Sequence, residues 1–128
     1  MTIHDRLTSF VRVTLGCGCP DEVFSEIVVR SISGNNPAPV RLAIEVGGRL
    51  LVHVIEGGSA LRKPGLIPSV VEDGVRRRDE RGFNRFRLVV ALEGGGAAGE
   101  ILQRRFDAAS ARDDRTHLHV LPSSAIPW

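Results

Sequence analysis

The clearest pattern along the chain is a pair of short strand-like segments, of which the first alternates between two faces. They are VRLAIEV (40–46) and RLLVHVI (49–55), joined by Gly47-Gly48. Such alternation is typical of half-buried strands, and two glycines tolerate the positive φ angles of a tight hairpin turn. The pattern therefore predicts a β-hairpin. A third strand is predicted at FRLVVALE (86–93), whose nearly continuous apolar run indicates a central place in a sheet.

The remaining elements follow from the same reading of the pattern. FVRVTL (10–15) alternates and predicts a first strand, and RTHLHVL (115–121) predicts a last one. Between them, apolar residues at helical spacing predict helices over 20–31, with Pro20 at the first position, and over AAGEILQRRFDAAS (97–110). Residues 59–79 read as helical material interrupted by prolines and a glycine.

The predicted order is β-α-β-β-α-β-α-β, in a chain of 128 residues. Its first six elements match a ferredoxin-like split βαβ unit, and the added helix and strand would extend a mixed sheet on which the helices pack. A thioredoxin-like α/β fold is the alternative, because it too places a cysteine pair between an early strand and its helix. The length and the apolar fraction of 42% predict a single domain over 1–128.

Both cysteines of the chain, Cys17 and Cys19, lie in GCGCP at the junction of the first predicted strand and helix. A helix N-terminus favours the thiolate form of a nearby cysteine. Two converging thiolates suit a soft metal such as copper, zinc or an iron–sulfur cluster, and they also suit dithiol–disulfide cycling. Acidic Asp21 and Glu22 favour a cation. The sequence thus predicts soft-metal binding, with a thiol–disulfide redox protein or an interaction module with structural cysteines as alternatives.

Histidines supply candidate ligands to complete such a site. His117 and His119 alternate along the last predicted strand and share one face, and zinc prefers four ligands. His53 is expected on the polar face of the hairpin. The place of the cysteine pair is similar to that in heavy-metal-associated domains, a resemblance that implies a soft metal. The loop departs from that family, since one residue rather than two separates the cysteines and no methionine precedes them.

The arginine-rich segment RRRDERGFNRFRL (76–88) is the other conspicuous feature. Its six arginines and two phenylalanines resemble a phosphate- and base-binding surface. However, acidic residues intersperse it and the net charge of the chain is only +2. The segment therefore predicts a salt-bridged helix end, and nucleic acid is not the expected partner.

The cellular setting is predicted from what surrounds these motifs. No apolar run reaches the length of a membrane span, and MTIHDRLTSF lacks the character of a secretory signal. We therefore expect a cytoplasmic protein without a membrane partner, whose cysteines are kept reduced. Trp128 at the C-terminus is typical of a side chain that packs on its own domain or on a second subunit, and it suggests a homodimer.

Overall fold

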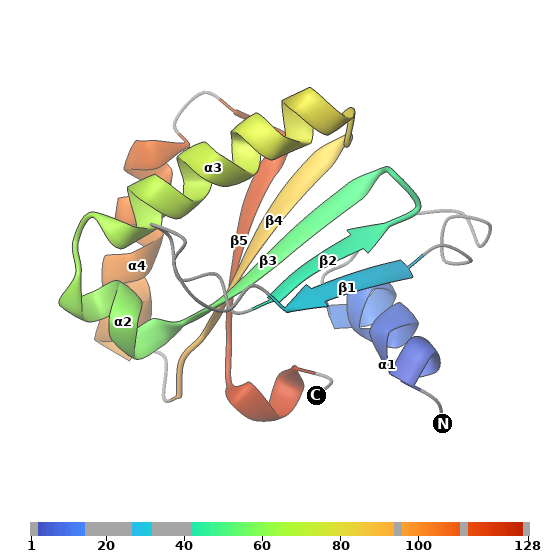
Figure 1. The fold of residues 1–128 in the computed structure, drawn as a ribbon. Coiled ribbons are helices and arrows are strands. Elements are labelled where there is room, and N and C mark those ends of the chain that lie inside the picture. Colours follow the sequence, from blue (N-terminus) through green and yellow to red (C-terminus); the bar gives the residue numbers. More distant parts are fainter. Residues whose placement is uncertain (1–2, 15–26, 32–41, 94–95, 111–112, 127–128) are drawn as a thin grey trace.

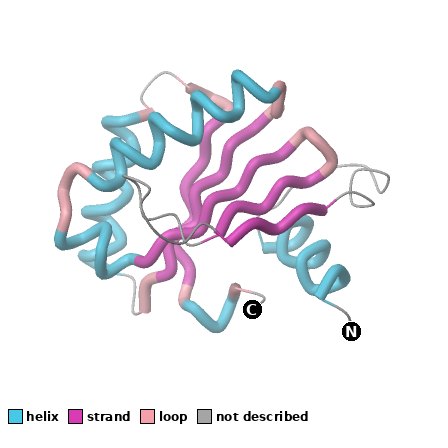
Figure 2. The backbone as a smooth tube through the Cα atoms, in the orientation of Figure 1, coloured by secondary structure: helices cyan, strands magenta, loops and turns pink. Residues whose placement is uncertain are grey.

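The computed structural model describes residues 3–14, 27–31, 42–93, 96–110 and 113–126. In this part of the chain, a five-stranded mixed sheet carries helices on both faces (Figures 1 and 2). The strands are β1 (Ile27–Ser31), β2 (Leu42–Val46), β3 (Leu50–Glu56), β4 (Arg85–Ala91) and β5 (Thr116–Leu121). The helices are α1 (Ile3–Ser9), α2 (Gly57–Arg62), α3 (Leu66–Arg81) and α4 (Gly96–Ala109), with a π-helical turn η1 (Phe10–Thr14) and a 3-10 turn η3 (Ser123–Ala125).

The strands lie in the order β1-β2-β3-β4-β5. The first three are antiparallel neighbours, and β3, β4 and β5 are parallel. Parallel neighbours need a crossover connection, which α2 and α3 supply before β4 and α4 supplies before β5. The predicted hairpin is confirmed as β2 and β3, and its turn uses Gly47 and Gly48 at φ angles of 54° and 67°.

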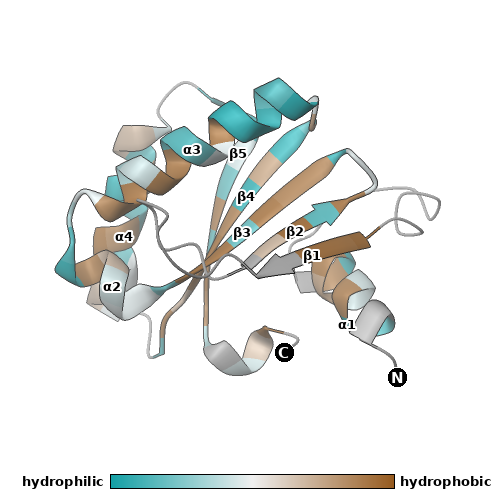
Figure 3. Cartoon of the chain, in the orientation of Figure 1, coloured by the Kyte–Doolittle hydropathy of each residue, from teal (hydrophilic) through white to brown (hydrophobic). Residues whose placement is uncertain are grey.

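Two apolar clusters cover the two faces of the sheet. The larger cluster lies under α2, α3 and α4 and includes Leu51, Ile55, Phe86, Leu88 and Leu102. The smaller one lies between the opposite face and α1 with η1, and it includes Leu7, Phe10, Ile44, Val52 and Val89. Figure 3 shows β3 largely in the hydrophobic colour, whereas the ends of β4 and β5 beside α3 are hydrophilic.

Close contact between α3 and the sheet depends on one glycine. A Cβ atom at Gly74 would lie 2.2 Å from Cζ of Phe86, which is far inside van der Waals contact. Phe86 is itself fully buried at the centre of the larger cluster. The glycine that weakens the helical pattern of the sequence is therefore the position at which α3 packs on β4.

Two element predictions near the N-terminus are wrong. Residues 10–14 of the predicted first strand form η1, because Leu7, Phe10 and Val11 bury one helical face while Val13 stays 76% exposed. Residues 27–31 of the predicted helix form β1, where β-branched Ile27, Val28 and Val29 suit a strand paired with β2. The loop and helix start predicted over 15–26 lie outside the described residues.

The other element predictions are confirmed within a few residues. The interrupted helical segment forms α2 and α3, and the strands and helix predicted after it are β4, α4 and β5. The fold is accordingly mixed α+β, with helices packed on a mixed sheet. Neither the ferredoxin-like unit nor the thioredoxin-like alternative is confirmed. No helix in the described segments is long and apolar enough to cross a membrane.

Candidate functional site

His117 and His119 lie side by side on β5, opposite Arg85 and Arg87 of β4. Arg87 pairs with His117 in the parallel register, and all four residues point away from α2, α3 and α4. Arg85 Nη1 lies 3.1 Å from Nε2 of His117, and Arg87 Nη1 lies 2.9 Å from Nε2 of His119. Strand alternation thus brings two guanidinium groups and two imidazole rings onto one surface of the sheet.

The hydrogen bonds fix the protonation state of both rings. A guanidinium group only donates, so Nε2 of each histidine accepts and the ring proton lies on Nδ1. Burial and the charge of Arg87 lower the pKa of His119 to about 4, and the same two causes lower the pKa of His117. Both imidazoles are therefore neutral at pH 7, and each keeps an Nδ1–H donor.

The two arginines of β4 lack a compensating carboxylate. Among the described residues, neither Arg85 nor Arg87 has an acidic group within ion-pair distance, and their side-chain partners are the two histidines. Nε of Arg87 is buried without a hydrogen-bond partner. Burial and the charge of Arg85 lower the pKa of Arg87, as expected for a cation that is partly removed from water beside a like charge.

A groove of about 600 Å³ runs along this surface and around the free edge of β5 to α4. Its volume lies in the range of small-molecule sites. Ten residues line it, and they carry both signs of charge: Arg87, Gln103, Phe106, Asp107, Ser110, Asp113, Thr116, His117, Leu118 and His119.

The arginines of α3 have quite different surroundings. Arg76 and Arg77 are ion-paired with Asp73, and Arg81 lies 2.9 Å from Glu45. Arg78, which is 3% exposed, lies 3.0 Å from Asp79 and 2.7 Å from Asp113. The sequence-based prediction of a salt-bridged helix end is confirmed for these four residues.

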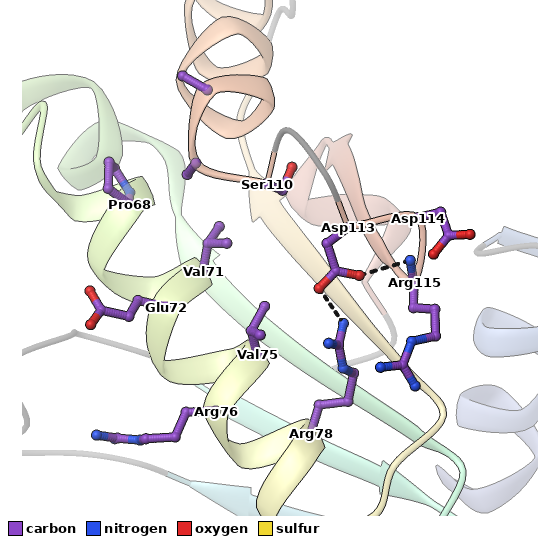
Figure 4. A pocket seen from close by; sticks show the side chains of 12 residues that line it. Pro68, Val71, Glu72, Val75, Arg76, Arg78, Ser110, Asp113, Asp114 and Arg115 are labelled. Atoms are coloured by element: carbon purple, nitrogen blue, oxygen red, sulfur yellow. Dashed lines mark hydrogen bonds and ion pairs between the residues drawn. The ribbon is translucent and has the colours of Figure 1, made fainter.

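A second groove, of about 910 Å³, lies between α3 and the end of α4 (Figure 4). At its polar end, Arg78 donates to Asp113 and to Oγ1 of Thr116, and the backbone N–H of Arg115 donates to Asp113. Burial acts to raise the pKa of Asp113, but the hydrogen bonds from Arg78 and Arg115 outweigh it and lower that pKa. Because these charges neutralise one another, the groove holds a structural ion network that ties α3 to β5.

His53 corrects the expectation that it lies on a polar face of the hairpin. It is 1% exposed on the α3 side of β3, and its ring meets Phe86 edge to face at a centroid distance of 5.1 Å. Neither ring nitrogen has a hydrogen-bond partner. Burial, with the nearby charge of Arg77, lowers its pKa to about 4. His53 is thus a neutral core residue whose polar atoms cost stability.

The predicted metal ligands are only partly placed by the structure. Cys17 and Cys19 lie outside the described residues, so their distance from His117 and His119 is not defined. Within the described residues, no group of three or more His, Cys, Asp or Glu side chains could hold a metal ion. A metal at Nε2 of either β5 histidine would have to displace an arginine donor.

Comparison with protein-family models, with curated proteins and with solved structures finds no match for this chain. The candidate site therefore rests on its own geometry. Sequence reasoning identified the histidine pair as ligands and treated the β4 arginines as part of one charged segment. The sequence signal for a shared site was the pattern Arg-x-Arg on one predicted strand together with His-x-His on another.

Proposed function

We propose that the chain is a binding protein for a small anionic ligand, held by Arg85, Arg87, His117 and His119 on the face of β4 and β5 that points away from α2, α3 and α4. The observation that carries this proposal is that both β4 guanidinium groups lack a carboxylate partner within the described residues. A phosphate or carboxylate group on the ligand would supply the missing negative charge. Charge-assisted hydrogen bonds of this kind are about twice as strong as neutral ones.

The donors at the site favour an oxyanion. Arg87 uses Nη1 on His119, which leaves Nη2 as a charged donor for an oxygen of a phosphate or carboxylate. Nε is buried without a partner, so the Arg87 cation is incompletely compensated in the free protein, and a negative charge beside the guanidinium group would offset that cost. The Nδ1–H groups of the two neutral histidines add donors without adding positive charge.

Isothermal titration of the full chain with inorganic phosphate tests this proposal. We expect heat of binding for the wild type and a loss of affinity of about tenfold or more for Arg87→Gln, which removes a charge-assisted contact. Arg76→Gln is the matched control, because it removes a charge that is already paired with Asp73. Equal binding by the two variants, or no binding by the wild type, would contradict the proposal.

Soft-metal binding by Cys17 and Cys19, with His117 and His119 as further ligands, stays a proposal from the sequence. So do the thiol–disulfide and scaffold alternatives, the homodimer and the cytoplasmic location. Acidic Asp21 and Glu22 beside the cysteines support a cation. Native mass spectrometry of protein purified without oxygen tests the metal, which should disappear in Cys17→Ser and Cys19→Ser alike. A metal-free dithiol that loses two protons on oxidation would instead support redox chemistry.

A further inference from the structure

The groove beside β5 has a second pole, on α4. From Arg87 and His119 its lining continues around the edge of β5, past Leu118 and Phe106, to Gln103 and Asp107. The apolar pair comes from the larger core cluster and gives the wall between the two poles an apolar part, whereas the other lining residues are polar. A ligand that fills the groove therefore meets cationic donors at one end and a carboxylate at the other.

Asp107 is the negative group that remains available. It is exposed, it accepts a hydrogen bond of 2.8 Å from Nε2 of Gln103, and no cation of the described segments lies within ion-pair distance of it. Arg105 on the same helix donates instead to the carbonyl oxygens of Ala60 and Leu61. Asp113, the other acid in the lining, is bound to Arg78 and to the backbone N–H of Arg115.

Gln103 strengthens the acceptor character of this pole. Its amide nitrogen donates to Asp107, which leaves its amide oxygen as a second acceptor close to the carboxylate. An ammonium group is a compact cation with three donors and no acceptor, and it suits a carboxylate beside an amide oxygen.

We infer that the ligand is a small zwitterion, whose anionic group binds at the Arg87–His119 pair and whose ammonium group binds Asp107 and Gln103. This inference rests on the anion site proposed above and adds the second charge. The two poles are of opposite sign and lie in one groove of about 600 Å³, so one molecule can contact both. Aminoalkyl phosphates are one chemical class that carries both groups on a flexible apolar chain, and they serve as the probes.

The test compares matched probes on the full chain. Alkyl phosphates and the aminoalkyl phosphates of the same length, from two to six carbons, are titrated at pH 8, where every phosphate is a dianion. For at least one length, we expect the amine to raise the affinity about threefold, as an exposed ion pair does. Asp107→Asn should remove this preference, so that the alkyl and aminoalkyl phosphates of each length bind the variant with the same affinity. Asp114→Asn, a loop carboxylate outside this groove, is the control and should keep the preference.

The outcomes separate the two proposals. If alkyl phosphates bind and no chain length shows an amine preference, or if Asp107→Asn keeps the preference, the zwitterion inference is overturned and the anion site stands. If neither series binds, the anion site and the zwitterion inference both fail.

Discussion

Two groups of arginines, separated by only a few residues in the sequence, have opposite surroundings. Arg76, Arg77, Arg78 and Arg81 on α3 are all ion-paired with carboxylates, whereas Arg85 and Arg87 on β4 face neutral histidines. Within the first group, Arg81 joins α3 to β2 and Arg78 joins it to the loop before β5, while Arg76 and Arg77 pair within α3. The second group is a positive surface that the described residues do not neutralise.

The difference shows that a count of arginines does not locate a binding site. Helical spacing places Asp73 one turn before Arg76 and Arg77, where ion pairs form locally. Strand alternation gives Arg85 and Arg87 no such neighbour on their own element, so their partners come from β5. Whether the charge of Arg85 and Arg87 is neutralised therefore depends on the side chains of the neighbouring strand. That strand is β5, and the side chains are histidines.

The two groups of arginines should differ most in how much they stabilise the protein. Arg78→Met removes the buried cation that Asp113 and Asp79 share and leaves Asp113 with only the backbone N–H of Arg115, so we expect the free energy of unfolding to fall by about 3 kcal/mol. Arg87→Met removes a cation whose partner is a neutral ring, and it should change stability by less than about 1 kcal/mol. Urea unfolding measures both. Equal losses would mean that the β4 arginines are structural too.

The buried His53 should make the stability of the protein depend on pH. His53, under α3, has a pKa of about 4, against 6.5 for an unperturbed ring, so the unfolded chain binds this proton first as the pH falls. Stability should therefore drop between pH 6.5 and pH 4, by about 2 to 3 kcal/mol from this residue at pH 4.5. His53→Leu removes this pH-dependent loss of stability. As the pH is lowered, the urea midpoint of the variant should therefore fall less than that of the wild type. A constant difference between the two would show that His53 is not the titrating group.

A pair of glycines tests how tightly the α3 side is packed. Gly74→Ala places a methyl group against Phe86 and should destabilise the protein by about 2 kcal/mol, despite the better helix propensity of alanine. Gly99 of α4 has nothing within 4 Å of its Cβ position, so Gly99→Ala should raise stability by a few tenths of a kcal/mol up to about 1 kcal/mol. Thermal unfolding of the two variants gives shifts of opposite sign if α3 packs as described.

The smallest effect concerns the exposed pair on α3. Arg76 is an exposed partner of Asp73, which Arg77 also contacts, so Arg76→Ala should change stability by less than about 0.5 kcal/mol. High salt should remove even that difference, because exposed charges are screened. A loss as large as that of Arg78→Met would show that surface pairing, rather than burial, stabilises this helix.

The sequence predicted the C-terminal two thirds of the fold well, and physical reasons explain why. The hairpin had alternation and a glycine turn, and β4 had a continuous apolar run bounded by polar residues. At the N-terminus the pattern was ambiguous, because FVRVT combines strand alternation with apolar residues at helical spacing. The burial of Phe10 and Val11 against the sheet favours the helical conformation over the strand. Strand order was not predicted, since pairing depends on contacts between distant segments.

The candidate site was predicted in part. His117 and His119 were recognised as functional candidates on one face, and that placement is confirmed. Their neighbours were not foreseen, because no local pattern states that β4 lies beside β5 in this register. The burial of His53 was missed for a related reason, since only the position of α3 over β3 makes that side of the hairpin apolar.

An anion site on β4 and β5 is tested most directly by side-chain NMR of the arginine Nε–Hε groups during a titration with inorganic phosphate. Each arginine reports separately, so the two groups are compared in one sample. We predict that the resonances of Arg87 and Arg85 shift with saturation, while those of Arg76, Arg77, Arg78 and Arg81 stay in place. Uniform small shifts of all six, or shifts confined to α3, would contradict an anion site on β4 and β5.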